Sequence, residues 1–268
     1  MYSSPINILT NLSNKLLQNN QLDKLSSIAT TYYGISPMFG IEIEFYLSKN
    51  INPKQLEDLI SQNIKQERGL NQYEIALAPS YNLTDYAVKI TNLIQKMKNA
   101  AKILGGTVDL SAKPFANDYG NSIHFNLSLG GIDVLTKAAK SLCQYMLDTY
   151  YVFMPIEQDY LRNTVGFLAP THICYGGNNR TAAIRIPSSL PLRLEHRLSS
   201  PNVDPYLAMT TILYSILPGN KSNSAMSNFV KIYGNAHDKQ YKLVALPATM
   251  EQAISLFKIN FFQDLMST

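Results

Sequence analysis

The sequence has few charged residues, few cysteines and no long apolar run, and each of these absences argues against a class of protein. Charged residues make up 16% of the 268 positions, well below the ~25% that is usual for globular domains. The net charge of +4 is mild and its lysines and arginines are scattered, which argues against a nucleic-acid-binding protein. No apolar run approaches the ~20 residues of a membrane span, so no membrane association is expected.

The two cysteines, Cys143 and Cys174, lie far apart and form no CxxC motif. They indicate neither a disulfide framework nor a zinc site, and a reduced, cytoplasmic protein is the better interpretation. The N-terminus has no basic segment followed by a continuous apolar one, so no signal peptide is expected. A chain of 268 residues can bury a full core as one or two domains.

Apolar periodicity predicts alternating helices and strands. Helices are expected at residues 8–28, from Pro53 to about 67, at 84–104 and 132–150, from Pro205 onward, and from a capping box at Thr249 to about 265. Strands are expected at residues 40–47, 70–78, around 108 and 123–129, with a long functional loop at 155–179 and a linker at 217–240. This pattern indicates an α+β fold, in which helices pack on the apolar face of an antiparallel sheet.

The strand at residues 40–47 shows the alternation most clearly. Ile41, Ile43 and Phe45 share one face, while Glu42 and Glu44 lie on the other. Two glutamates at this spacing are ~7 Å apart, and such like charges raise one another's pKa unless a cation separates them. A solvated sheet edge explains the pattern equally well at this point.

The other strands also carry ionisable or polar residues on one face. These are Glu74, with Glu67 at the entry of its strand; His124, beside Asn126 and Ser128; and Arg193, Glu195 and Arg197. A lone strand histidine is more often structural, but five glutamates and a histidine on one polar, concave face are hard to explain without bound cations. Carboxylates suit Mg²⁺ and Mn²⁺, and of the two Mn²⁺ better tolerates one imidazole.

Four arginines surround Glu195 along the sequence: Arg180, Arg185, Arg193 and Arg197. One interpretation is a structural lattice of ion pairs. The other is a binding site for a phosphate or a carboxylate, because the guanidinium group presents a planar fork to either anion.

Five segments together resemble the catalytic domain of the glutamine synthetase family. They are GIEIEFYL, ERGLNQYE, KPF followed by GNSIHFNLSL, NNRTAAIRIP, and RLEHRLSSPNVDPYLA, in the family's order across residues 38–210. The resemblance implies a curved antiparallel sheet in a catalytic domain at residues 38–268, after an N-terminal helical segment at 1–37. It also implies two divalent metal ions, Mg²⁺ or Mn²⁺, one held by Glu44, Glu67 and Glu74 and the other by Glu42, His124 and Glu195.

The resemblance also implies roles for the remaining polar residues. Arg162, Arg197 and the backbone of Gly120 would hold the carboxylates of glutamate. Arg180 and Arg185 would neutralise the transferring phosphate, while Arg193 and Ser128 face ATP. The implied activity is an ATP-dependent carboxylate–amine ligase, in which γ-glutamyl phosphate is attacked by ammonia or another amine. A homo-oligomer is expected.

Three departures from the family's pattern stand out. Leu168 occupies the flap position where the family has the glutamate that deprotonates ammonium, and Asn126 replaces the second histidine of an HxH motif. Only about forty residues precede the strand of Glu42, so the family's N-terminal β-grasp domain is expected to be missing. The alternatives are a degenerate, non-catalytic homologue that binds nucleotide, metal or a partner protein, and a structural metal-binding protein.

Overall fold

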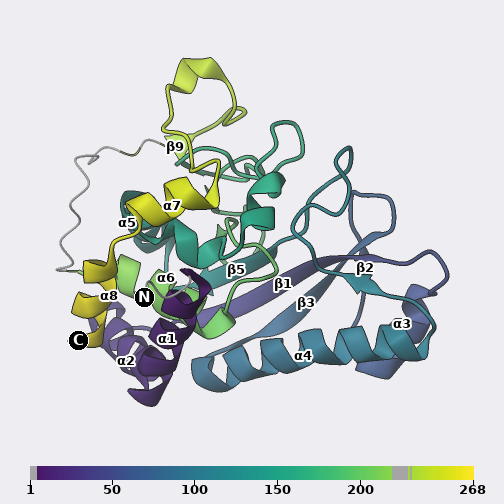
Figure 1. The fold of residues 1–268 in the computed structure, drawn as a ribbon. Coiled ribbons are helices and arrows are strands. Elements are labelled where there is room, and N and C mark those ends of the chain that lie inside the picture. Colours follow the sequence, from purple (N-terminus) through teal and green to yellow (C-terminus); the bar gives the residue numbers. More distant parts are fainter. Residues whose placement is uncertain (1–4, 219–228, 230) are drawn as a thin grey trace.

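The computed structural model describes residues 5–218, 229 and 231–268 (Figure 1). Residues 219–228 and 230 of the predicted linker at 217–240 therefore lie outside the described residues, whereas the rest of that range is described. Residues 231–232 join the sheet as a short strand, and residues 239–241 form a turn of 3₁₀ helix.

A nine-stranded sheet forms the centre of the described chain. Its strands are β1 (Met38–Leu47), β2 (Lys65–Gln66), β3 (Gln72–Ser80), β4 (Val108–Asp109), β5 (Ile123–Ser128), β6 (Tyr175–Gly176), β7 (Ile184–Arg185), β8 (Leu194–His196) and β9 (Lys231–Ile232). Their order is β2-β3-β1-β5-β8-β7-β6-β9, with β4 also paired to β1.

The expectation of an antiparallel sheet was wrong at one end. The pairs from β2 to β7 are antiparallel, but β6 runs parallel to both β7 and β9. These three strands have two residues each, too few to show an alternation that would assign their direction. The sheet is therefore mixed, and its curvature remains a prediction.

The helices are α1 (Pro5–Gln18), α2 (Gln21–Tyr33), α3 (Pro53–Ile60), α4 (Leu83–Ile103), α5 (Ile132–Phe153), α6 (Pro205–Ile216), α7 (Met250–Leu256) and α8 (Ile259–Met266), with 3₁₀ helices η1 (Glu157–Arg162) and η2 (Lys239–Tyr241). Figure 1 shows α4 lying alongside β1 and β3. The buried faces of α4, α5 and α6 share one hydrophobic core with the strand residues Ile41, Ile43 and Phe125. This core leaves the opposite face of the central strands to their polar side chains.

Three helix predictions were wrong in their extent. The helix expected at 8–28 is divided at Asn20, whose φ of 49° breaks the α-helical path, a conformation that asparagine tolerates. The helix from Pro53 ends at Ile60, before Ser61 with a φ of 58°. The last helix is interrupted after Leu256, where the backbone N–H of Lys258 donates to the carbonyl of Asp148 in α5.

The N-terminal helices α1 and α2 are part of the same core. Leu12, Leu16 and Leu22 are buried in it, and Ser13 Oγ donates to Asp204 Oδ2 at 2.7 Å. The division at residue 37 remains a prediction. Within the described residues, no helix combines the length and the apolar character that crossing a membrane requires.

Asp204 is a cap whose loss should be measurable. Its Oδ1 accepts from the backbone N–H groups of Tyr206 (2.9 Å) and Leu207 (3.1 Å) at the start of the buried helix α6. We expect Asp204→Ala to cost about 1–2 kcal/mol, which lowers the melting temperature by roughly 2–8 °C. Asp204→Asn is the control, because it keeps the acceptor and should cost much less. Equal losses in the two variants, measured by thermal unfolding, would show that the charge rather than the cap matters.

Candidate active site

A cavity of about 260 Å³ opens on the polar face of the sheet. Every residue that the sequence assigned to metal or substrate lines it, apart from Ser128: Glu42, Glu44, Glu67, Glu74, Gly120, His124, Arg162, Arg180, Arg185, Arg193, Glu195 and Arg197. Strand register brings them together, since β1 pairs Glu42 with His124 and Glu44 with Glu74. In the same way, Glu195 of β8 is opposite both Asn126 and Arg185.

The carboxylates of β1 and β3 carry negative charge that the protein does not fully neutralise. Burial, followed by the charges of Glu42, Glu44 and Glu67, raises the pKa of Glu74 to about 8. Burial and the charge of Glu44 also raise the pKa of Glu67. A bound cation would relieve both effects, because it favours the ionised carboxylates.

One trio in this cluster has the geometry of a metal site. Glu42, Glu74 and His124 each offer a ligand atom, and these atoms lie within 4.8 Å of one another. Two carboxylates and one imidazole suit Mn²⁺ or Mg²⁺, so the donor set fits the expected metals. The trio takes members from both of the metal sites that the family resemblance implies, because register places Glu74 near Glu42 and His124 as well as opposite Glu44.

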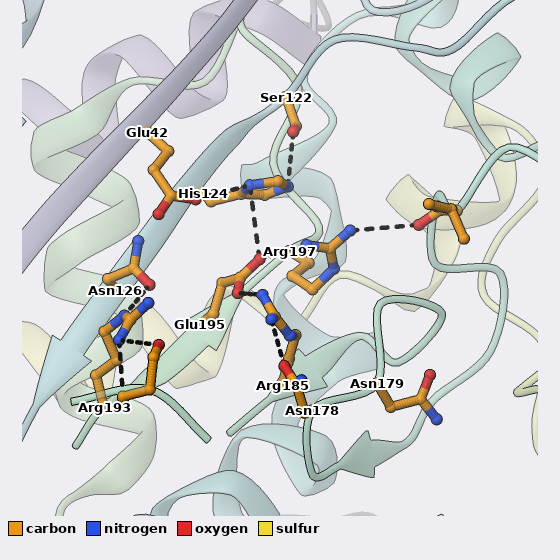
Figure 2. Close-up of polar contacts among 12 residues, drawn as sticks. Glu42, Ser122, His124, Asn126, Asn178, Asn179, Arg185, Arg193, Glu195 and Arg197 are labelled. Atoms are coloured by element: carbon orange, nitrogen blue, oxygen red, sulfur yellow. Dashed lines mark hydrogen bonds and ion pairs between the residues drawn. The ribbon is translucent and has the colours of Figure 1, made fainter. Parts of the chain in front are cut away.

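His124 lies between Glu42 of β1 and Glu195 of β8 and contacts both carboxylates (Figure 2). Its Nδ1 lies 3.3 Å from Glu42 Oε2 and 3.6 Å from Glu195 Oε1, and its Nε2 lies 2.7 Å from Ser122 Oγ. Burial would raise the pKa of Glu42, but the hydrogen bond and charge of His124 hold it below its ordinary value. Ser122 also donates to Glu44. Sequence reasoning missed Ser122, although it shares the face of His124 two residues away.

Glu195 is buried between guanidinium groups (Figure 2). Arg185 donates to its Oε2 at 2.6 Å and Arg197 donates to its Oε1. Burial alone would raise the pKa of Glu195, but the charges of Arg197, His124 and Arg185 lower it to about 2. This part of the site matches the ion-pair lattice considered from the sequence.

Arg180 and Arg193 do not belong to that lattice. Arg193 donates to Asn126 Oδ1 at 3.1 Å and to atoms of Ser189 and Pro191. Arg180 is exposed, and among the described residues it makes no ion pair or hydrogen bond, although its charge lowers the pKa of Glu67. Its guanidinium group is therefore free to meet an anion at the cavity mouth.

The part of the cavity wall around Arg162 and Gly120 is held by hydrogen bonds to the backbone. Arg162 is buried and donates to the carbonyls of Leu198 (3.3 Å) and Arg197 (3.1 Å), while its Nε finds no hydrogen-bond partner in the part of the chain that the structure describes. Burial lowers the pKa of Arg162 to about 10, against the opposing charge of Glu44. A Cβ at Gly120 would lie 2.6 Å from the carbonyl of Ala112 and 2.9 Å from Arg162 Cγ, so only glycine fits.

Gln72 positions both ends of this wall, and sequence reasoning missed its role. Its Oε1 accepts from the N–H of Gly69 (3.0 Å), and its Nε2 donates to the carbonyl of Gly120 (3.0 Å). The backbone of Gln72 also accepts from the N–H of Glu67 at 2.9 Å. One buried amide thus connects the segment of Glu67 to the loop of Gly120. The signal was its place on the polar face of β3, two residues before Glu74.

Ser128 lies apart from the cavity. It ends β5 opposite Met38, is half-buried, and does not line the cavity. Arg193 is the residue of the predicted ATP pair that does line it.

The flap position has an apolar and aromatic character. Leu168 has a φ of 61°, and its carbonyl accepts from Arg197 NH2 at 3.4 Å. The ring of Phe167 has Lys113 Nζ 3.7 Å from its centroid and meets Tyr119 edge-on at 5.7 Å. Of the described residues that line the cavity at this corner (Tyr119, Phe167, Leu168 and Ala169), none has a carboxylate.

Comparison with known proteins adds independent observations. The family described as "Glutamine synthetase, catalytic domain" matches residues 58–266. A glutamine synthetase of Sulfolobus acidocaldarius is 28% identical over 204 residues, which cover 65% of this chain and 42% of that protein. A glutamate–methylamine ligase of Methyloversatilis universalis is 27% identical over 238 residues, 79% and 51% of the two chains. The gamma-glutamylputrescine synthetase of Escherichia coli is 27% identical over 221 residues, 75% and 45% of the two chains.

The chain therefore spans about half or less of the length of these curated relatives. A solved structure titled "GmaS/ADP complex-Conformation 1" matches with a TM-score of 0.73 at 18% identity, covering 92% of this chain and 69% of that one. At this identity the match supports the fold alone, and it agrees with the mixed sheet and helices described above.

Glu74→Gln should raise the melting temperature without metal and reduce the gain in melting temperature that metal gives. The folded pKa of Glu74 is about 8 against an ordinary 4.5. The folded state thus binds the extra proton, and stability is lost as pH rises between these values. Without metal at pH 8 we expect the variant to melt roughly 2–4 °C higher for each kcal/mol of repulsion removed. With Mn²⁺ the wild type should gain more melting temperature than Glu74→Gln, because the variant lacks one metal ligand.

Thermal shift in EDTA and in Mn²⁺, at pH 5 and pH 8, measures both effects. Glu251→Gln is the control, because this exposed carboxylate lies on α7, outside the cavity lining. A wild type that gains nothing from Mn²⁺ or Mg²⁺ would contradict the metal site.

Proposed function

Because the chain belongs to the glutamine synthetase family, we propose that it is an ATP-dependent carboxylate–amine ligase acting on glutamate or a similar amino acid. One observation carries the proposal: a carboxylate cluster suited to metal and a set of arginines line the same cavity. Phosphoryl transfer to a carboxylate needs this combination, because negative charge accumulates on several oxygens at once.

In the proposed reaction an oxygen of the substrate glutamate's side-chain carboxylate attacks the γ-phosphorus of ATP, and ADP leaves. The nitrogen of an amine then attacks the acyl carbon of the resulting γ-glutamyl phosphate, releasing phosphate and losing a proton. Mg²⁺ or Mn²⁺, held by Glu44, Glu67 and Glu74 and by Glu42, His124 and Glu195, would supply positive charge to the phosphate oxygens.

The arginines divide into two groups by their surroundings. Arg162 is buried beside Gly120 and donates to the backbone of the buried Arg197, a setting that suits the fixed carboxylates of the amino acid. Arg180 and Arg185 lie nearer the surface, where they would meet the transferring phosphoryl group, and Arg193 would contact ATP together with Ser128. We place this activity in the cytoplasm, in keeping with two buried, free cysteines, and expect a homo-oligomer.

Leu168 limits which nucleophile can attack the γ-glutamyl phosphate in the second step of the proposed reaction. Leucine cannot accept the proton of an incoming ammonium ion, so the nucleophile must arrive as a neutral amine. Two of the relatives are named for methylamine and putrescine rather than ammonia. Leu168 also favours the second candidate, a degenerate homologue that binds ligands without turning them over. Metal-dependent ADP release with glutamate across a panel of amines separates the two candidates.

Arg180→Lys and Arg185→Lys should differ in their effect on the melting temperature. Arg180 is exposed and makes no hydrogen bond among the described residues, so its replacement should leave the melting temperature unchanged and lower turnover about 10²-fold. Arg185 donates hydrogen bonds to Glu195 and Asn178, so its replacement should lower both the melting temperature and the turnover. ADP release and thermal unfolding measure the pair. A stability loss with full turnover in Arg180→Lys would favour a purely structural role.

Leu168→Glu tests whether the flap base alone is missing. General-base catalysis typically contributes ~10²–10⁴-fold, so we expect ammonium-dependent glutamine formation to rise by up to that factor. Leu168→Gln is the matched control, with similar size and no basic oxygen. Efficient use of ammonium by the wild type at neutral pH would contradict the proposed preference for a neutral amine. ADP release that is absent in all three proteins would favour the degenerate homologue.

A further inference from the structure

A second pocket adjoins the candidate active site at Leu168 and Arg180. We call it the distal pocket. It is open, has a volume of about 490 Å³, and shares these two residues with the cavity. Its walls come from the turn between β6 and β7, residues 177–181, and from residues 232–235, which include the end of β9. A molecule that extends past Leu168 from the reaction centre would therefore enter it.

The distal pocket offers hydrogen-bond donors that the fold does not use. Asn178 accepts from Arg185 and Asn235 accepts from the N–H of His237, both through their Oδ1 atoms. The NH₂ groups of these two amides make no hydrogen bond among the described residues. Tyr233 is 83% exposed and adds a phenolic hydroxyl. Asn179, in contrast, is committed to Thr181 and Gly234 (Figure 2 shows it beside Asn178).

The charge of the distal pocket is positive. None of the described residues that line it is acidic, and Arg180 is part of the lining. The ammonium of Lys231 is also close, since a Cβ on Gly177 would lie 3.5 Å from its Nζ. Ile232 and Leu168 provide apolar surface between the charged groups. Such surroundings repel a second ammonium group and accept an oxygen that carries lone pairs.

We propose that the distal pocket holds the far end of the amine substrate, and that this end carries an oxygen acceptor, a hydroxyl or a carboxylate, rather than a second ammonium. The inference rests on the proposed ligase function. It narrows the substrate to monoamines whose carbon chain passes Leu168 and whose oxygen meets Asn178, Tyr233 and Asn235. A diamine is disfavoured, because its second charge would lie beside the like charges of Arg180 and Lys231.

Four amines of equal chain length test the proposal: propylamine, 3-aminopropan-1-ol, 3-aminopropanoate and 1,3-diaminopropane. We expect 3-aminopropan-1-ol or 3-aminopropanoate to exceed both propylamine and 1,3-diaminopropane by about tenfold in kcat/KM for metal-dependent ADP release. The comparison of alcohol with carboxylate identifies the acceptor. Equal rates for all four, or the highest rate with 1,3-diaminopropane, would overturn the proposal.

Variants in the distal pocket make the test specific. Asn235→Asp keeps the oxygen that accepts from the N–H of His237 at 3.0 Å and adds the missing negative charge. It should shift the ratio of diamine to amino alcohol about tenfold toward the diamine. Tyr233→Phe should reduce the preference for oxygen. Asn92→Asp, an exposed position on α4, is the matched control and should change neither ratio.

Binding separates failure of the distal pocket from failure of the ligase. Ligand-observed saturation-transfer NMR on the full chain with Mn²⁺ replaced by Mg²⁺ reports binding of each amine without turnover. Stronger transfer to an oxygen-bearing amine, lost in Asn235→Asp, supports the pocket even if no amine releases ADP. No difference among the amines in both measurements would overturn it.

Discussion

Mutual repulsion among carboxylates on one face of the sheet is the constraint on which the site depends. Burial, followed by the charges of Glu42, Glu44 and Glu67, raises the pKa of Glu74 to about 8. The surrounding residues stabilise these carboxylates, and that of Glu195, to different extents. His124 stabilises the charge of Glu42, and two arginines stabilise that of Glu195. Among the described residues, Glu67 and Glu74 have no comparable partner, so a bound cation would relieve the repulsion on this side of the cavity.

The sequence was sufficient to predict the strands that carry the site, and the reason is physical. β1, β3 and β5 have six residues or more, so their alternation of apolar and polar positions is unambiguous. The faces of Glu42, Glu74 and His124 follow from it. Strands of two residues, such as β6 and β9, have no period to detect. The breaks at Asn20 and after Leu256 depend on tertiary contacts, which local propensity does not contain.

The same limit applies inside the site. Sequence places a residue on a face but does not give the register between strands, which decides that Glu74 lies near Glu42 and His124. It also gives no weight to uncharged residues that only hold others in place. Gln72 and Ser122 act through hydrogen bonds to groups distant in sequence. Phe167 is fixed by Lys113 and Tyr119, contacts that no local pattern indicates.

The hydrogen bond from Arg197 to the carbonyl of Leu168 has a consequence for the order of events. Arg197 also donates to Glu195, so its guanidinium group is shared between the buried carboxylate and the loop of Leu168. A ligand that draws the NH2 of Arg197 toward itself weakens the attachment of that loop. By thermodynamic linkage, a ligand that holds the loop in place must in turn change the affinity of the first. Ligand binding at Arg197 and the position of the Leu168 loop would thus be coupled in one equilibrium.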